Sequence, residues 1–160
     1  MDLSRLRRQL VMHEGLRLHP YRCNAGKLTI GVGHNLEADG GDAGMILKRP
    51  VMMDTEITEQ EAMAILDHDI ACTIPGIQRL IPSWDSLSDN RQHVMMDMAF
   101  NLGLHGLSKF RRTLDAIAAG DYDRAAYQML QSQWAAQVGK RAERLARAMS
   151  GDVDPLEVKT

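Results

Sequence analysis

Three residues in one short stretch near the start of the chain carry groups that could act on a single bond. Glu14 supplies a carboxylic acid, Cys23 a thiol and Thr29 a hydroxyl. Cleavage of a glycosidic bond generally needs a protonated carboxylic acid at the leaving oxygen and a second group that orients water or attacks from the opposite side. A hydroxyl can hold water without ionising. The three side chains therefore predict a site for sugar cleavage, with Glu14 as the acid.

A helix followed by a hairpin would position these three side chains. Leucines recur at helical spacing over residues 3–10 and predict an amphipathic helix that ends at Glu14. Residues 24–26, Asn-Ala-Gly, are a turn signal, and residues 28–33 alternate as a strand does. A hairpin at this turn would fold the thiol and the hydroxyl back toward Glu14.

Most of the remaining chain predicts helices. Residues 58–61, Thr-Glu-Gln-Glu, resemble a capping box that opens a helix through Ile70. Pro75 removes a backbone donor and clashes with the preceding turn, so we expect a kink or break near Ile74. Further helices are expected after Ser88 or Asp89, after Ser108, after Asp121, and from about Trp134 toward Met149.

Three ordered blocks of sequence resemble one known family. The first block is Glu14-Gly15, Gly26, Thr29-Ile30-Gly31, Gly33 and His34. The second is Ala99-Phe100-Asn101-Leu102-Gly103 with Gly106 and Phe110, and the third is Trp134, Arg141 and Arg144. Together they resemble the phage-type lysozymes, the T4-lysozyme-like endolysins of glycoside hydrolase family 24, over most of residues 1–149.

The resemblance implies an α+β, mainly helical, lysozyme-like fold with two lobes in a single catalytic domain of residues 1–160. The N-terminal lobe, about 13–58, would hold a small β-hairpin sheet. An interlobe helix would follow at about 59–80. The helical C-terminal lobe would comprise about 81–150 together with the helix of residues 1–12.

The resemblance also implies a reaction. Glu14 matches the general acid, Cys23 occupies the position of the second catalytic residue, and Thr29 matches the hydroxyl that positions water. The family accepts Asp or Cys at the middle position. The implied enzyme is a glycoside hydrolase, a muramidase that cleaves the β-1,4 bond between N-acetylmuramic acid and N-acetylglucosamine in peptidoglycan, with inversion favoured because the middle residue is not a carboxylate.

Further positions follow from the same resemblance. His34 matches a histidine that pairs with an acid, here Asp69, and Arg141 matches an arginine that reaches back toward Glu14. The substrate-binding positions are Phe100 and Asn101, and the supporting positions are His34, Asp69, Trp134 and Arg141. No metal and no cofactor are expected.

Composition bounds the partners. The formal net charge is only −2, and 44% apolar residues suffice for a real core. We expect no nucleic-acid partner. The charge is uneven: residues 41–100 carry 4 basic and 10 acidic side chains, whereas 101–149 carry 8 and 4. A weak contact between the basic C-terminal lobe and an anionic cell envelope is one explanation, and a solvated face is the other. We expect a monomer.

Cysteine use and hydropathy bear on location. Cys23 and Cys72 offer no disulfide framework, and we find neither a signal peptide nor a transmembrane span. We therefore expect the protein in the host cytoplasm during phage infection, and acting in the periplasm or cell wall after release. Since peptidoglycan lies outside the inner membrane, the family implies a holin for that release.

Three alternatives stay open. A lytic transglycosylase also uses one glutamate but closes the sugar to a 1,6-anhydro product. A zinc amidase would use imidazoles and a thiolate, which are available at His13, His19, Cys23 and His34. A membrane-disrupting protein would use a basic amphipathic helix, formed here by Lys140, Arg141, Arg144 and Arg147 beside Val138, Ala142, Leu145 and Met149.

Overall fold

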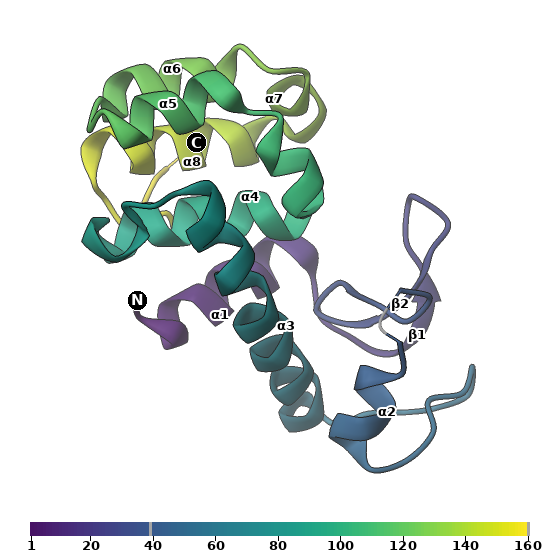
Figure 1. The fold of residues 1–160 in the computed structure, drawn as a ribbon. Coiled ribbons are helices and arrows are strands. Elements are labelled where there is room, and N and C mark those ends of the chain that lie inside the picture. Colours follow the sequence, from purple (N-terminus) through teal and green to yellow (C-terminus); the bar gives the residue numbers. More distant parts are fainter. Residues whose placement is uncertain (39, 160) are drawn as a thin grey trace. The chain divides into compact units, whose positions relative to one another are not determined.

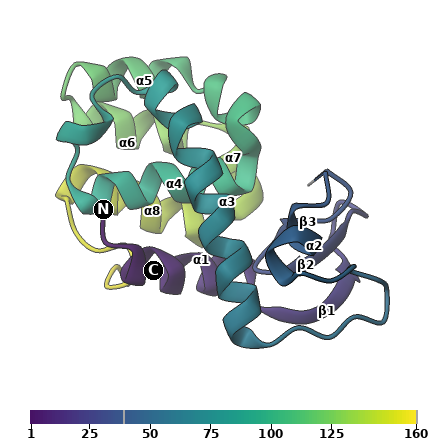
Figure 2. The same ribbon diagram turned by 60° about the horizontal axis from the view of Figure 1, so that its bottom comes forward.

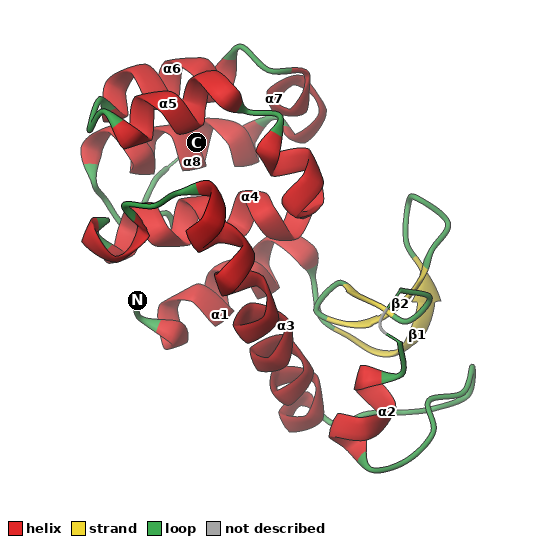
Figure 3. Ribbon diagram, in the orientation of Figure 1, coloured by secondary structure: helices red, strands yellow, loops and turns green. Residues whose placement is uncertain are grey.

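The computed structural model describes residues 1–38 and 40–159, and the chain forms two compact units. The sheet unit is Ser4–Cys72, and the helical unit joins Met1–Leu3 to Thr73–Thr160. Helices dominate both units, and the strands shown in yellow in Figure 3 all belong to the sheet unit. The predicted fold, α+β and mainly helical with a small sheet, is therefore confirmed.

The sheet unit follows the predicted order of helix and hairpin, with one strand more. Its elements are α1 (Leu3–Glu14), β1 (Arg17–Arg22), β2 (Leu28–Gly31), β3 (His34–Asn35), α2 (Asp42–Leu47) and the start of α3 (Glu59–Leu80). The strands are antiparallel in the order β1-β2-β3, which Figure 2 shows side by side. Tyr21 of β1 lies opposite Thr29 of β2. β3 was not predicted, because a strand of two residues leaves no alternation in the sequence.

One hydrophobic cluster holds β2 in place. Ile30 of β2 is fully buried and packs with residues of α2 and α3. The cluster comprises Ile30, Ala43, Leu47, Ile57, Ala62 and Ile65. Because side chains alternate along a strand, burial of Ile30 directs its neighbour Thr29 to the other face of the sheet, the face that Tyr21 shares.

The predicted capping box at the start of α3 is confirmed. The Thr58 backbone N–H donates to Oε2 of Glu61 at 2.8 Å, and the Glu61 N–H donates to Oγ1 of Thr58 at 3.1 Å. The Arg49 guanidinium also bonds the Glu61 carboxylate. These contacts with Arg49 and Thr58 lower the pKa of Glu61 from 4.5 to about 2.

This pKa predicts a pH dependence of stability. A carboxyl group whose folded pKa is depressed stabilises the fold above its unfolded pKa and loses that contribution as pH falls through its folded pKa. The contribution of Glu61 should therefore be complete above pH 4.5 and decline toward pH 2. We expect Glu61→Gln to lower the free energy of unfolding in urea at about pH 6, and this deficit to shrink at about pH 2.5. Glu59→Gln is the control, and an unchanged deficit at low pH would contradict the prediction.

Helix α3 continues through Pro75, so of the kink or break predicted near Ile74 the break is wrong, and the kink stays a prediction. A proline inside a helix removes one hydrogen bond, normally donated to the carbonyl four residues earlier. Here that carbonyl belongs to Ala71, and both Ala71 and Pro75 are exposed. Water can therefore satisfy the freed carbonyl, which lowers the cost of continuing the helix.

The helical unit gathers the remaining helices, which Figure 1 shows from teal to yellow. They are the short 3₁₀ turn η1 (Trp84–Ser86), α4 (Asp89–Ser108), α5 (Arg111–Ala118), α6 (Tyr122–Leu130), α7 (Gln133–Val138) and α8 (Lys140–Gly151). Ser88 and Asp121 cap α4 and α6, as predicted. Ser108 ends α4 instead of capping α5. The single helix expected from Trp134 is two helices, because Gly139 adopts a φ of 54° between them.

The basic helix of the membrane-disruption alternative is α8, and its apolar face is not available to a lipid surface. Ala142, Leu145 and Met149 are at most 1% exposed within the core of the helical unit. Arg144 and Arg147 donate to the carbonyls of Val158 and Lys159. Across the described residues, no helix is both long and apolar enough to cross a membrane.

Candidate active site

Glu14 is the last residue of α1, and its half-buried side chain lies against the turn between β2 and β3. A Cβ built on Gly33 would stand 3.6 Å from Oε2 of Glu14 and 3.5 Å from its Cβ. Gly33 has a φ of 74°, which side-chain-bearing residues rarely adopt. Glycine therefore gives the turn both its conformation and its close approach to the carboxyl group.

Cys23 follows β1 in a tight hydrogen-bonded turn. Its N–H donates to the Lys27 carbonyl at 3.0 Å, and the Gly26 N–H donates to the Cys23 carbonyl at 2.8 Å. The backbone N–H groups of Ala25 and Lys27 and the hydroxyl of Thr29 face the sulfur, and they lower the pKa of the Cys23 thiol. A neighbouring cation often lowers the pKa of a thiol. The cause is instead the turn itself, whose donors stabilise the thiolate.

Thr29 sits on β2 with its side chain 3% exposed, and its hydroxyl donates to the Lys27 carbonyl at 3.0 Å. A hydroxyl has one proton and two lone pairs. While the proton is bonded to Lys27, the lone pairs of Thr29 can accept a hydrogen bond from water. When Cys23 ionises, the same proton can turn toward the sulfur, which is how Thr29 contributes to the lowered pKa.

The thiol titration gives a test of this turn. In a Cys72→Ser background, Cys23 is the remaining cysteine, and its alkylation rate by iodoacetamide reports the thiolate fraction at each pH. We expect a midpoint below the ordinary value of 9.0, and Thr29→Val should move that midpoint upward because one donor is lost. Thr113→Val, at a buried threonine of the helical unit, is the control. A midpoint that Thr29→Val leaves in place would contradict the assignment.

Tyr21 also belongs to this cluster, and the sequence analysis missed it. It lies opposite Thr29 across the β1–β2 pair, so the two side chains share a face of the sheet. Burial raises the pKa of the Tyr21 hydroxyl, and the charges of Cys23 and Glu14 raise it further, whereas Arg17 lowers it. The Arg17 guanidinium stands 5.5 Å from the ring centre. Tyr21 and Cys23 are two positions apart, and side chains at that spacing on a strand share a face. This signal was overlooked because the segment was interpreted as the approach to the turn at residues 24–26.

His34 and Asp69 form the expected pair. Nδ1 of His34 lies 2.9 Å from Oδ2 of Asp69 and 3.0 Å from Oδ1, with the histidine 6% exposed. The pair links β3 to α3 within the sheet unit. It holds the end of the turn that carries Gly33, and the supporting role of the pair stays a prediction.

In the helical unit, three aromatic and amide side chains form a second group. Nε1 of Trp134 donates to Oδ1 of Asn101 at 2.8 Å. The ring of Phe110 meets that of Trp134 edge to face, with centroids 6.0 Å apart. Trp134 is 4% exposed, whereas Asn101 is exposed and Phe100 is half-buried. Trp134 therefore supports this surface from inside, while Asn101 and Phe100 remain accessible to a ligand.

Arg141 makes a buried ion pair. Its Nε donates to Oδ1 of Asp97 at 2.8 Å, and Asp97 is fully buried. Asp97 was not among the predicted site residues. The signal was that this carboxylate stands among the methionines of α4, which are buried. A buried acid needs a cation as its partner. The expectation that Arg141 acts on Glu14 stays a prediction.

Most of the chain matches the model of one known protein family. A model of the phage lysozyme family matches residues 11–149, a stretch that includes Glu14, Cys23, Thr29 and Arg141. The chain belongs to the phage lysozyme family. As a member of that family, it is a lysozyme-type glycoside hydrolase, which confirms the predicted family and enzyme class.

The relatives of this phage lysozyme include proteins of different kinds. It is 31% identical over 162 residues to the pre-baseplate central spike protein Gp5 of Enterobacteria phage T4, covering 92% of this chain but 28% of that protein. It is 27% identical to the probable T4-type lysozyme 2 of Dictyostelium discoideum, covering 89% of this chain and 92% of the relative. It is 30% identical to the endolysin of Acyrthosiphon pisum secondary endosymbiont phage 1, covering 81% and 77%. The chain thus spans less than a third of the spike protein.

The zinc alternative finds no support in this phage lysozyme. Over residues 1–38 and 40–159, no three His, Cys, Asp or Glu side chains are grouped as a metal site requires. The histidines at positions 13, 19 and 34 and Cys23 therefore do not form the ligand set that the alternative needed. The sheet unit instead holds a thiol and a hydroxyl at the β1–β2 hairpin and an acid against the β2–β3 turn. These groups are suited to protonating a leaving group and holding water.

Proposed function

We propose that the protein is a muramidase that hydrolyses the β-1,4 bond between N-acetylmuramic acid and N-acetylglucosamine in peptidoglycan, with inversion at the anomeric carbon. The observation that carries the proposal is that Cys23 and Thr29 lie at the β1–β2 hairpin and Glu14 lies against Gly33 at the β2–β3 turn, with the charges of both Cys23 and Glu14 acting on Tyr21. All of them belong to the segment that the phage lysozyme family matches. Peptidoglycan as the substrate is supported by relatives named endolysin and lysozyme.

Each group has a separate part in the proposed reaction. Glu14 donates a proton to the glycosidic oxygen as the bond to the leaving sugar breaks. Thr29 accepts a hydrogen bond from the attacking water through a lone pair, because its own proton is held by the Lys27 carbonyl or by the ionised sulfur of Cys23. Cys23, whose pKa is lowered by the turn, accepts the proton that water loses. Water then attacks the anomeric carbon directly, and no covalent bond to sulfur is formed.

Product analysis tests the bond and the mechanism. Purified peptidoglycan digested in buffered solution should release reducing N-acetylmuramic acid ends. NMR of the first products, taken before the anomers equilibrate, should show the α anomer, since the β bond is inverted. Ends of the 1,6-anhydro type would instead establish the transglycosylase. A first product in the β configuration would overturn inversion in favour of attack by Cys23.

The biological setting is part of the proposal. The endolysin relative supports a role in host lysis, with accumulation in the host cytoplasm and release to the cell wall by a holin. Expression in a bacterial host with and without a holin gene tests this, since lysis should require both. The likeness to the spike protein favours a second setting, a lysozyme domain carried in the virus particle. Mass spectrometry of purified virus particles distinguishes these two settings. A lysozyme domain carried in the particle should be detected there, whereas an endolysin should be found free in the lysate.

A further inference from the structure

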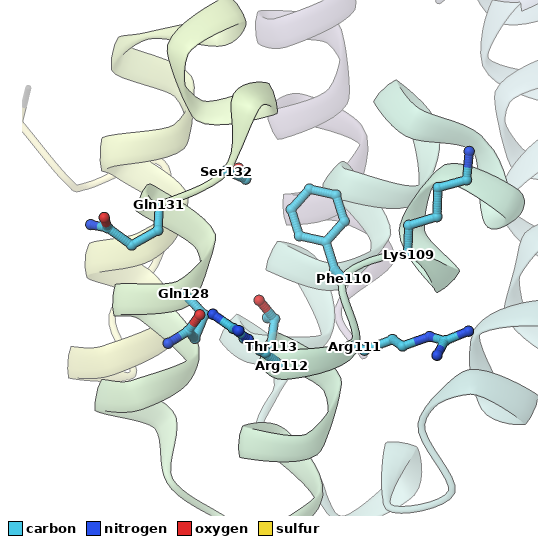
Figure 4. Close-up of a pocket in the computed structure, with 8 residues that line it drawn as sticks. All are labelled: Lys109, Phe110, Arg111, Arg112, Thr113, Gln128, Gln131 and Ser132. Atoms are coloured by element: carbon cyan, nitrogen blue, oxygen red, sulfur yellow. The ribbon is translucent and has the colours of Figure 1, made fainter.

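A pocket of about 430 Å³ lies within the sheet unit between α1 and α3, which adjoin in Figures 1 and 2. We name it the α1–α3 pocket, and its lining consists of Ser4, Arg7, Arg8, Val11, Met12 and Met63. The pocket of the helical unit in Figure 4 is different, because glutamine amides, hydroxyls and three cations line most of it. The lining of the α1–α3 pocket is mainly hydrocarbon, and two arginines carry its charge.

The apolar part of this lining is left uncovered by the fold. Met12 is 45% exposed, and Val11 and Met63 are half-buried. Methionine is flexible and polarisable, so two of them can adapt to the shape of an apolar ligand. A methylene group is close in size to a water, which occupies about 30 Å³ of liquid, so the pocket has room for a chain of roughly ten to fourteen carbons.

The two arginines of the pocket are used differently. Arg7 donates to both carboxylate oxygens of Asp67, from Nε at 2.6 Å and from Nη2 at 2.7 Å. Its charge is thereby neutralised, and its aliphatic stem can line the pocket. Arg8 is exposed, and it pairs with no acid in the part of the chain that the structure describes. The pocket therefore has one cation to spare.

A hydroxyl group lies beside this spare cation. Nη1 of Arg8 donates to Oγ of Ser4 at 3.4 Å. Because the Ser4 oxygen accepts this bond, its own proton can be donated to another group. The other N–H groups of Arg8 and the hydroxyl of Ser4 can thus donate together to one anion. A single guanidinium matches the single charge of a carboxylate, whereas a phosphate monoester carries about −1.5 to −2.

We propose that the α1–α3 pocket binds a medium-chain fatty acid, with its acyl chain against Val11, Met12 and Met63 and its carboxylate on Arg8 and Ser4. One spare cation fits one negative charge, and the volume fits one chain, which excludes a phospholipid with two chains. The unfolded chain has no such pocket. Binding therefore also stabilises the folded sheet unit by mass action.

The methyl signals of the methionines test the pocket directly. The full chain is titrated with dodecanoate below the micellar concentration and followed by NMR. We expect saturable shifts at Met12 and Met63, whereas Met52 and Met53, each 63% exposed and outside the lining, should not shift. Each methylene removed from the ligand should weaken binding about fourfold.

Two outcomes of this titration would overturn the proposal. Equal shifts at the exposed Met52 and Met53 would show that the amphiphile adsorbs to any apolar surface. Shifts of Met12 and Met63 on dilution of the protein without ligand would show that a second copy of the chain occupies the pocket.

Variants test the carboxylate contact. Arg8→Gln should weaken the binding of dodecanoate about tenfold, because a charge-assisted hydrogen bond is lost, and it should leave the binding of uncharged dodecanol unchanged. Arg79→Gln, at an exposed arginine of α3 outside the pocket, is the matched control and should bind both ligands as the parent does. Met12→Glu, at an exposed position, should abolish dodecanoate binding by placing a like charge beside the chain. If the parent binds dodecanol or dodecyl phosphate as tightly as dodecanoate, the pocket does not select a carboxylate and the proposal fails.

Discussion

Glu14→Gln is expected to lower the turnover of peptidoglycan about a thousand-fold, the middle of the range for loss of a general acid. Glutamine keeps the size of the side chain and its packing beside Gly33, but its amide is not acidic enough to protonate the glycosidic oxygen. The decisive measurement is the rate of reducing-end release from purified peptidoglycan, since turbidity alone also responds to binding.

The control for this variant is Glu59→Gln, an exposed glutamate in the first turn of α3. It should retain parental turnover. Both variants should unfold at the urea concentration of the parent, which shows that the loss comes from chemistry and not from the fold. If Glu14→Gln retains turnover within a few-fold of the parent, the acid is elsewhere and the site assigned at the β1–β2 hairpin is wrong.

Arg141→Met is expected to destabilise the helical unit by about 3–5 kcal/mol, the usual cost of breaking a buried ion pair from one side. Asp97 is fully buried, and the variant removes the guanidinium that neutralises it while keeping much of the aliphatic volume. The free energy of unfolding in urea measures the loss.

A double variant separates the ion pair from packing. Asp97→Leu/Arg141→Met replaces both charges with apolar groups, and it should recover much of the lost stability, as buried pairs often do when both partners are replaced. Arg79→Met, at an exposed arginine of the same unit, should change the free energy of unfolding by less than about 0.5 kcal/mol. A single Arg141→Met as stable as Arg79→Met would show that Asp97 does not depend on this cation.

The sequence allowed prediction of those features that depend on local pattern. Three such features are the helix that ends at Glu14, the hairpin, and the capping box of Thr58 and Glu61. Each follows from the spacing of residues that are close together in the sequence. Two errors came from signals that are locally ambiguous. A serine at a helix end can close one helix or open the next, as Ser108 shows, and a proline such as Pro75 need not end a helix where water can reach the freed carbonyl.

The parts of the site that the sequence did not reveal depend on contacts between residues distant in the chain or on backbone geometry. Asp97 and Arg141 are 44 positions apart, and neither predicts the other. The lowered pKa of Cys23 depends on two backbone N–H groups, which every sequence has and only a particular turn directs at the sulfur. Tyr21 becomes part of the cluster through the strand register, which sets it opposite Thr29.

The turn from Cys23 to Lys27 also has a consequence for how the site assembles. The entropy lost in closing a loop grows with the logarithm of its length, so a loop of a few residues is among the least costly to close. The bonds from Cys23 to Lys27 and from Gly26 to Cys23 close such a loop, and Thr29 lies just beyond it. The thiol and the hydroxyl are therefore brought together by contacts between residues that are very close in the sequence. Contacts of this kind are expected to form early in folding.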